Sequence, residues 1–361
     1  MRRLVAAALI VGAAALSRAS ADALSPAPAH QSSARYEFSS QHMGTLARIV
    51  LYAPGEAAAR DASSRAFARI AELDAVMSDY REDSELTALC RRAGQGPVRV
   101  SGDLFRVLAA SVRLAHDSGG AFDVTAAPLI HLWRRARRIG QLPDRAEIEA
   151  ARALTGRDRL ILDARTHTAD LRSAGMQIDL GGIGKGFAAQ EAAALIRRLG
   201  YRTALIAIGG DIVAVGAPPG RTGWTIDVAD LTTGGKAPQQ ILLRDAAVST
   251  SGDAEQWVAI DGVRYSHIID PRSGMALTGR RSVTVMAPDG TLSDALATTV
   301  CVLGPVEGLA LIERTTGAAA RISLLEGDGI RRFASRRWRY FAAAGSGPMS
   351  TFRNSTSAPS A

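Results

Sequence analysis

A glycine-rich run between an acid and a lysine has the clearest chemical potential in the sequence. It extends from Asp179 to Gly186 and reads DLGGIGKG. An apolar run precedes it and a helical pattern follows, so free backbone N–H groups at the helix start could bind phosphate. It is not a Walker loop, since Asp179 and Gly186 stand where that loop needs Gly and Ser or Thr. The spacing of its glycines also differs from that of a Rossmann fingerprint. A ligand-free turn is the alternative, but the bracketing Asp179 and Lys185 favour an anionic ligand with a metal ion.

Asp294 and Thr298 form a second candidate site. They are four residues apart in a helical pattern and therefore share one helix face. A carboxylate and a hydroxyl are hard oxygen donors of the kind that Mg²⁺ binds. The segment has a purely structural alternative, because Thr291 and Asp294 have the spacing of a capping box at a helix start. The residues alone leave both interpretations open.

Three further segments contain reactive residue types. His267 leaves a strand in the stretch SHIIDPRSG, either as a base or as a histidine packed at a strand end. Asp123, at the end of the stretch GAFD, precedes an apolar helix and could serve only as its N-cap. The stretch STSGD, residues 249–253, lacks the flanking glycines of a nucleophile elbow and is interpreted as a turn.

The elements that must position these residues follow from hydrophobic periodicity. Helices are expected at Gly55–Met77, Gly102–His116, Arg145–Leu154, Ile183–Leu199, Leu292–Leu303 and Val306–Thr315. Strands are expected at Met43–Tyr52, Leu160–Leu162, Met176–Leu180, Thr203–Ile208, Trp224–Val228, Ile241–Leu243, Trp257–Ile260, Ser282–Met286, Arg321–Leu325 and Arg331–Phe333. Helices in the first third and strands later predict an α+β fold rather than βαβ alternation.

The N-terminus has the pattern of a cleaved export signal. Arg2 and Arg3 precede the apolar stretch Leu4–Leu16, and the small residues 19–21 form a cleavage site. An uncleaved anchor is the alternative, and no cysteine near the cleavage site offers a lipid attachment point. We therefore expect a signal peptide at 1–21, a linker at 22–34, a catalytic domain at 35–344 and a disordered tail at 345–361, in a periplasmic or extracellular protein.

Composition narrows the possible partners. The net charge of +8 comes almost wholly from arginine, since Lys185 and Lys236 are the only lysines. The arginines are scattered and no reading motif accompanies them, so nucleic-acid binding is not expected. Cys90 and Cys301 could pair in an oxidising compartment. Cys301 lies in an apolar helical run, however, which favours two separate buried thiols over a disulfide.

Taken in order, the segments AFD, DLGGIGKG, GGD, HIIDPRSG and DALATT resemble the FAD:protein FMN transferase family, often called the ApbE family. The matching stretches run from His42 to Thr298. The resemblance implies an α+β fold of mixed or antiparallel sheets flanked by helices, with FAD in a cleft between two halves. It implies cleavage of FAD, release of AMP and transfer of FMN to a Thr or Ser hydroxyl of an exported or membrane acceptor protein.

The resemblance also assigns residues. It implies that Asp294, Thr298 and the backbone carbonyl of Gly182 ligate Mg²⁺, and that His267 activates or orients the attacking hydroxyl. The FAD contacts that it implies are Met43, Tyr80, Ala121, Phe122, Asp123, Asp179, Lys185 and Ile269. The chain departs from the family after Trp133, where Arg134-Arg135-Ala136 stands in place of a frequent Gly-Phe-Gly turn. An FAD pyrophosphatase and a non-catalytic FAD-binding protein are the alternatives.

Overall fold

An eight-stranded sheet dominates the computed structural model, which describes residues 33–228, 231, 239–253, 256–327 and 329–341. Each of its neighbouring strand pairs is antiparallel. Its strand order is β1 (Ala34–His42), β2 (Thr45–Ala53), β6 (Ala204–Ile208), β7 (Asp211–Val215), β10 (Ala247–Gly252), β14 (Arg281–Ala287), β15 (Ala319–Glu326) and β16 (Gly329–Ala334).

Three smaller antiparallel sheets accompany it. They comprise β11 (Trp257–Ile260), β12 (Val263–Asp270) and β13 (Met275–Thr278); β3 (Val98–Arg99), β5 (Thr168–Leu171) and β4 (Leu160–Asp163); and β8 (Trp224–Val228) with β9 (Gln239–Leu243). The helices are α1 (Glu56–Met77), α2 (Glu85–Arg91), α3 (Gly102–Asp117), α4 (Ala127–Ile139), α5 (Arg145–Ala153), α6 (Gly184–Arg198) and α7 (Gly290–Arg314), with the 3-10 turns η1 (Val124–Ala126), η2 (Arg157–Arg159) and η3 (Arg336–Tyr340). The predicted α+β class is confirmed.

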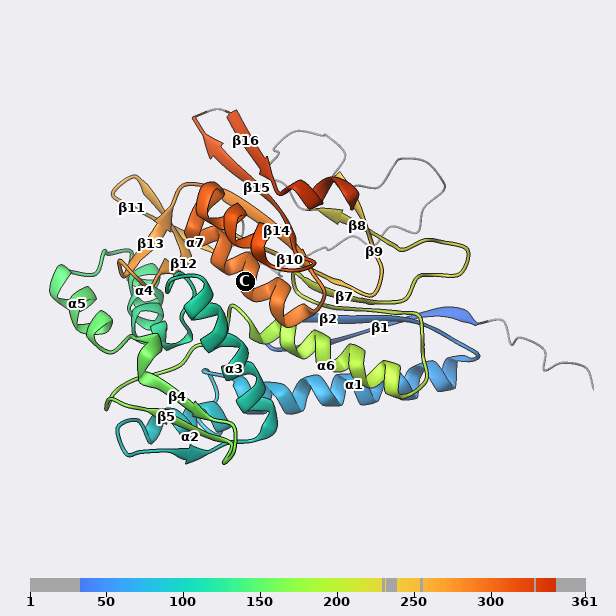
Figure 1. Cartoon of the computed structure of the whole chain (residues 1–361), viewed down its shortest axis with the longest axis horizontal. Helices are drawn as coiled ribbons and strands as arrows, with labels where there is room; N and C mark the ends of the chain where they lie inside the picture. Colours follow the sequence, from blue (N-terminus) through green and yellow to red (C-terminus); the bar gives the residue numbers. More distant parts are fainter. Residues whose placement is uncertain (1–32, 229–230, 232–238, 254–255, 328, 342–361) are drawn as a thin grey trace, which may run out of the picture. The chain divides into compact units, whose positions relative to one another are not determined.

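The central strands of the large sheet, such as β6 and β7, are buried on both faces, and successive side chains point to opposite faces. On β2, Ile49 and Leu51 join the main core cluster, in which α1, α3, α6 and α7 take part. Val50 points to the opposite face and joins a second cluster with Trp224 of β8 and Trp338 of η3. Figure 1 shows α1 and α6 running side by side along β1 and β2. Two helices on this face, α6 and α7, carry the predicted site residues Lys185, Asp294 and Thr298.

The first turns of α6 and α7 approach each other at a pair of glycines. A Cβ atom on Gly186 would lie 2.1 Å from the carbonyl oxygen of Gly290, and one on Gly290 would lie 2.4 Å from the carbonyl oxygen of Gly186. Both distances are far below any van der Waals contact, so only glycine allows this crossing. The two backbones therefore meet at the point where both helices begin.

The C-terminal helix combines two of the expected helices. Within α7, Gly304 has a φ of 73°, so the helix breaks between the two predicted segments. Among the described residues, α7 is long and apolar enough to cross a membrane, judged by length and composition. It packs on α6, β10 and β14, and 56% of its most apolar window is buried. These contacts are those of a core helix.

Several expectations were wrong. Met176–Leu180 is not a strand, and the N–H of Asp179 donates to the carbonyl of Val124 in η1 rather than to a neighbouring strand. Residues 249–253 are not a turn: most of them lie in β10, between β7 and β14. The first predicted strand starts late, at Thr45, since Met43 and Gly44 form the positive-φ turn of the β1–β2 hairpin.

Two further points concern the chain's ends and its thiols. The predicted signal peptide and tail lie outside the described residues, and β1 begins at Ala34, the last residue assigned to the linker. Cys90 and Cys301 are separate free thiols, as expected, although only Cys301 is fully buried. Burial raises the pKa of Cys301 to about 12, so this thiol is inert at neutral pH.

We predict that Gly186→Ala destabilises the protein. The added methyl group would collide with backbone rather than with a flexible side chain, so α6 and α7 would have to separate. Overpacking of this kind costs about 1–3 kcal/mol, and more where the backbone cannot yield. Urea unfolding followed by circular dichroism would measure the loss.

Gly102→Ala is the matched control, because Gly102 also lies in the first turn of a helix. A Cβ atom there would meet only the tip of Arg106, at 3.7 Å. Its free energy of unfolding should equal or slightly exceed that of the wild type. Equal stabilities for the two variants would contradict the close crossing of α6 and α7.

Candidate active site

Lys185, Asp211 and Asp294 form a buried charged cluster beside the crossing of α6 and α7. The ammonium of Lys185 donates to Oδ2 of Asp211 at 2.7 Å and lies 4.0 Å from Oδ2 of Asp294. Both carboxylates are almost completely buried. Two buried acids therefore share one cation, and the nearer acid takes its hydrogen bond.

Asp294 does not cap its helix. The N-cap of α7 is Asp289, whose side chain accepts the N–H of Leu292, so the capping box expected from Thr291 and Asp294 does not form. Oδ2 of Asp294 instead accepts the backbone N–H of Gly186 on α6 at 2.9 Å. The carboxylate is thus held across the helix crossing and is available to a ligand at the start of α6.

Thr298 lies one turn further along α7, on the same face as Asp294. A Cβ atom on Gly182 would lie 3.1 Å from Oγ1 of Thr298 and 3.4 Å from the ring of Phe122. Oγ1 of Thr298 is also 3.4 Å from the hydroxyl of Ser251 on β10. The fold therefore brings together Gly182, Thr298 and Phe122, which lie far apart in the sequence.

The cluster has unusual proton affinities. Burial, together with the negative charge of Asp211, raises the pKa of Asp294 to about 7, although Lys185 and Gly186 act in the opposite direction. Burial alone would lower the pKa of Lys185, but Asp211 and Asp294 outweigh it and raise that pKa. Lys185 thus stays charged, and the site carries an excess of negative charge whenever Asp294 is ionised.

Asp179 and Tyr80 are linked through Arg134 of α4. Its guanidinium donates to Asp79 at 2.5 Å and to Asp179 at 2.6 Å, and it lies 4.7 Å from the ring centre of Tyr80. The other carboxylate oxygen of Asp179 accepts the N–H of Gly181 at 2.7 Å. Asp179 therefore connects the glycine-rich turn to Arg134 of α4.

His267 lies in the interior of β12, not at the strand end that the sequence predicted. Its Nδ1 is 3.2 Å from the carbonyl oxygen of Gln256, which fits Nδ1–H as the donor and leaves Nε2 as an acceptor. Burial lowers the pKa of the half-buried imidazole, and the positive charges of Arg137 and Lys185 add to this effect. The lowered pKa favours the neutral imidazole, whose Nε2 can accept a proton.

The remaining predicted residues have varied positions. Met43 is near the glycine-rich turn, since a Cβ atom on Gly184 would lie 3.8 Å from its Cε. Ala121 is buried in the main core, whereas Ile269 is buried in a separate cluster with Trp133 and Tyr265. Neither side chain is exposed to a ligand.

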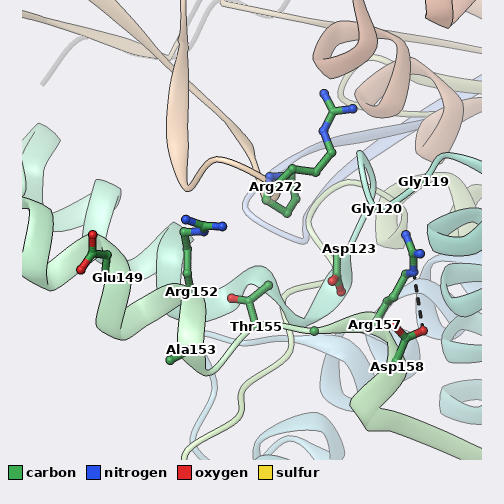
Figure 2. A pocket seen from close by; sticks show the side chains of 12 residues that line it. Gly119, Gly120, Asp123, Glu149, Arg152, Ala153, Thr155, Arg157, Asp158 and Arg272 are labelled. Atoms are coloured by element: carbon green, nitrogen blue, oxygen red, sulfur yellow. Dashed lines mark ion pairs between the residues drawn. The ribbon is translucent and has the colours of Figure 1, made fainter.

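Asp123 faces a different space. It caps η1, where one carboxylate oxygen accepts the N–H and the hydroxyl of Thr125. The predicted cap therefore lies on the 3-10 turn before the apolar helix, because the N-cap of α4 itself is Ala126. It lines an open pocket of about 480 Å³. Figure 2 shows it there together with Arg157 and Arg272. Burial raises the pKa of Asp123. No described hydrogen bond or ion pair joins its carboxylate to the Lys185 cluster.

Comparison with known proteins assigns the chain to a family. The model of the ApbE family matches residues 43–322. The chain belongs to the ApbE family. It is 35% identical over 294 residues to the FAD:protein FMN transferase of Treponema pallidum, covering 77% of this chain and 81% of the relative. The corresponding Vibrio cholerae enzyme is 32% identical over 304 residues, or 83% and 90% of the two chains.

Solved structures agree with this assignment. The flavin transferase ApbE from Vibrio cholerae superposes with a TM-score of 0.78 at 30% identity, over 86% of this chain and 99% of that one. The ApbE protein of Thermotoga maritima has a TM-score of 0.77 at 30% identity, over 86% of this chain and 100% of that one. The ApbE fold is thus shared along most of the chain.

Two site residues were missed when the sequence was interpreted residue by residue. Asp211 follows two glycines at the start of β7 and was noted only as part of a family motif. Arg134 was noted only as a departure from the ApbE pattern. An acid beside glycines at a strand start was the available signal for Asp211. Nothing in the local sequence of Arg134 indicates its partners.

Proposed function

We propose that this chain is a Mg²⁺-dependent transferase that cleaves FAD and attaches the FMN half to a Thr or Ser hydroxyl of an acceptor protein, releasing AMP. The observation that carries the proposal is the buried cluster of Asp211, Asp294 and Lys185 at the start of α6. The names of the relatives in the ApbE family support the same reaction. A protein that only stored FAD would have no need of two buried carboxylates sharing one cation.

The described residues fit a magnesium ion. Asp294, Thr298 and the backbone carbonyl of Gly182 supply three oxygen donors around the helix crossing. Among the described residues no cluster of three or more His, Cys, Asp or Glu side chains could hold a metal. A single carboxylate suits Mg²⁺, which keeps several waters and is usually completed by substrate phosphates. A divalent cation there would also offset the excess negative charge.

The chain's own residues would bind the phosphates of FAD and accept the proton of the acceptor hydroxyl. The free N–H groups at the start of α6 and the ammonium of Lys185 would bind the pyrophosphate of FAD. The bound metal would stabilise the charge that develops on the phosphates as AMP leaves. Nε2 of His267 would take the proton of the acceptor hydroxyl as the hydroxyl oxygen bonds to the FMN phosphorus. The bond from that phosphorus to the bridging oxygen breaks, and AMP departs with the oxygen.

Hydrolysis of FAD by water is the alternative within the same site. It would leave FMN free, whereas transfer leaves flavin covalently attached to the acceptor. We propose an exported or membrane acceptor, because residues 1–21 have the pattern of an export signal. Incubation with FAD, Mg²⁺ and a threonine-bearing acceptor, followed by denaturing electrophoresis and flavin fluorescence, separates the two reactions.

We predict that Asp294→Asn abolishes AMP release while the protein stays folded. The amide removes the charge that a hard cation requires but keeps the shape of the side chain. Asp289→Asn is the matched control, since Asp289 is the N-cap of α7 and Asn caps helices equally well. AMP release from FAD at a series of Mg²⁺ concentrations is the measurement.

The wild type should also show proton competition at this site. A proton on Asp294, whose pKa is about 7, excludes the metal, so the Mg²⁺ requirement should rise towards about tenfold per pH unit below 7 and level off above it. Wild-type activity in Asp294→Asn would remove Asp294 from the metal site. Loss of activity in Asp289→Asn would show that AMP release depends on the start of α7 and not specifically on Asp294.

A separate prediction concerns Asp211. Asp211→Asn should free the ammonium of Lys185 to move from 4.0 Å into contact with Asp294, where it competes with Mg²⁺. The Mg²⁺ concentration for half-maximal AMP release should rise about tenfold, which corresponds to about 1.4 kcal/mol. Adding Lys185→Met to this variant removes the competing charge and should lower the requirement again. An unchanged requirement in the single variant would show that Asp211 does not restrain Lys185.

His267→Ala should spare FAD binding and slow transfer by about 10²–10⁴-fold, the usual contribution of a positioned general base. The ordinary pKa of histidine is about 6.5, and burial lowers the pKa of His267. Protonation of this base should therefore slow the wild-type enzyme only at a pH below about 6.5. Single-turnover transfer from pH 5 to 8 measures both effects.

His116→Ala is a suitable control, since His116 is exposed near the end of α3. Added imidazole should partly restore transfer by His267→Ala if the residue is a base. A variant that keeps the wild-type rate and pH profile would leave His267 as a packing residue of β12.

A further inference from the structure

We infer that Arg134 is a positioning residue for FAD in this chain, holding the ring of Tyr80 as an open stacking platform and fixing the glycine-rich turn through Asp179. The inference rests on the proposed function, which makes FAD the ligand. Arg134 stands where the sequence departs from the pattern of its family, so its role belongs to this chain's own structure.

The guanidinium of Arg134 joins three segments that are remote in sequence. It extends from α4 to Asp79, just after α1, and to Asp179 in the loop before α6. The exposed fractions of the Asp79 and Asp179 side chains are only 13% and 5%. Two nearly buried carboxylates need a compensating cation, and the planar fork of arginine can donate to both at once.

Tyr80 presents one covered and one open ring face. Arg134 stacks at 4.7 Å from its ring centre, within the usual range for a cation–π contact. Yet 77% of the Tyr80 surface is exposed, which is high for an aromatic side chain held in place by a neighbour. The open face can stack on a planar ring. FAD offers two such rings, isoalloxazine and adenine.

Asp179 extends the effect of Arg134 to the phosphate end of the site. One oxygen of its carboxylate accepts Arg134 and the other accepts the N–H of Gly181. The neighbouring residue, Gly182, lies against Thr298 in the proposed metal site. Arg134 thus connects the stacking platform and the glycine-rich turn through two charge-assisted hydrogen bonds.

Removal of Arg134 should disturb both ends. Asp79 would still lie 3.6 Å from Nε2 of His131, but the two carboxylates would no longer share a cation, so they would separate or one would take up a proton. The ring of Tyr80 would lose its support and regain rotational freedom, which raises the entropy lost on binding. A lysine at this position keeps the charge but cannot form the fork and the stack together.

The test is titration of FAD by its fluorescence in metal-free buffer with EDTA, where no turnover occurs. Arg134→Ala should raise the dissociation constant about tenfold or more, and Arg134→Lys should give an intermediate value. Arg138→Ala is the matched control, because Arg138 is exposed on the same helix, and its dissociation constant should equal that of the wild type. Circular dichroism checks folding, and Arg134→Lys serves if the alanine variant is unstable.

A double-mutant cycle separates positioning from general support. Tyr80→Leu should weaken FAD binding, and adding Arg134→Ala should cost less than it does alone, because the platform is already gone. Titration with FMN and with ADP identifies the stacked ring, since only the ligand that carries it should lose affinity in Tyr80→Leu. Unchanged FAD affinity in Arg134→Ala, or strict additivity in the cycle, would overturn the inference.

These results are independent of turnover. If the wild type released no AMP and attached no flavin to an acceptor, the proposed reaction would fail while the binding effects of Arg134 could still be measured. Conversely, normal transfer by the wild type with unchanged FAD affinity in Arg134→Ala would refute only the role of Arg134.

Discussion

The contact between Gly186 and Gly290 is the constraint on which the site depends. Because neither residue has a side chain, the starts of α6 and α7 come close enough for Asp294 to accept the N–H of Gly186. Thr298 then falls one turn further along α7, opposite Gly182. A single backbone approach thus aligns a carboxylate, a hydroxyl and a glycine-rich turn from segments more than 100 residues apart.

That close approach has an electrostatic cost. Asp294 and Asp211 are both buried there, in surroundings that favour neutral groups, and the pKa of Asp294 rises to about 7. A protein selected only for stability would avoid such a pair, because like charges in a buried site oppose folding. Perturbed carboxylates of this kind concentrate where a ligand supplies the missing charge. The cluster is therefore better explained by binding than by folding.

Local patterns in the sequence were sufficient to predict most helices and to predict that Asp294 and Thr298 share one helix face. They could not decide whether Asp294 caps its helix, since that depends on where the helix starts, and Asp289 starts it earlier. Residues 249–253 have turn-like composition, but residues 249–252 pair with β14 and Ser249 also pairs with β7. Arg134 bonds residues 55 and 45 positions away, and no spacing rule encodes such contacts.

Arg134 and Lys185 neutralise pairs of buried carboxylates at the two ends of the site, but with different geometry. In each, two buried carboxylates share one cation. The fork of Arg134 reaches both of its partners, at 2.5 and 2.6 Å, so that pair is satisfied and rigid. The single ammonium of Lys185 donates its hydrogen bond to Asp211 and stays 4.0 Å from Asp294, so Asp294 has only the longer ion pair. At Arg134 both carboxylates are neutralised, which suits the binding of a neutral planar ring. At Lys185 the weaker pairing of Asp294 suits the binding of a metal ion.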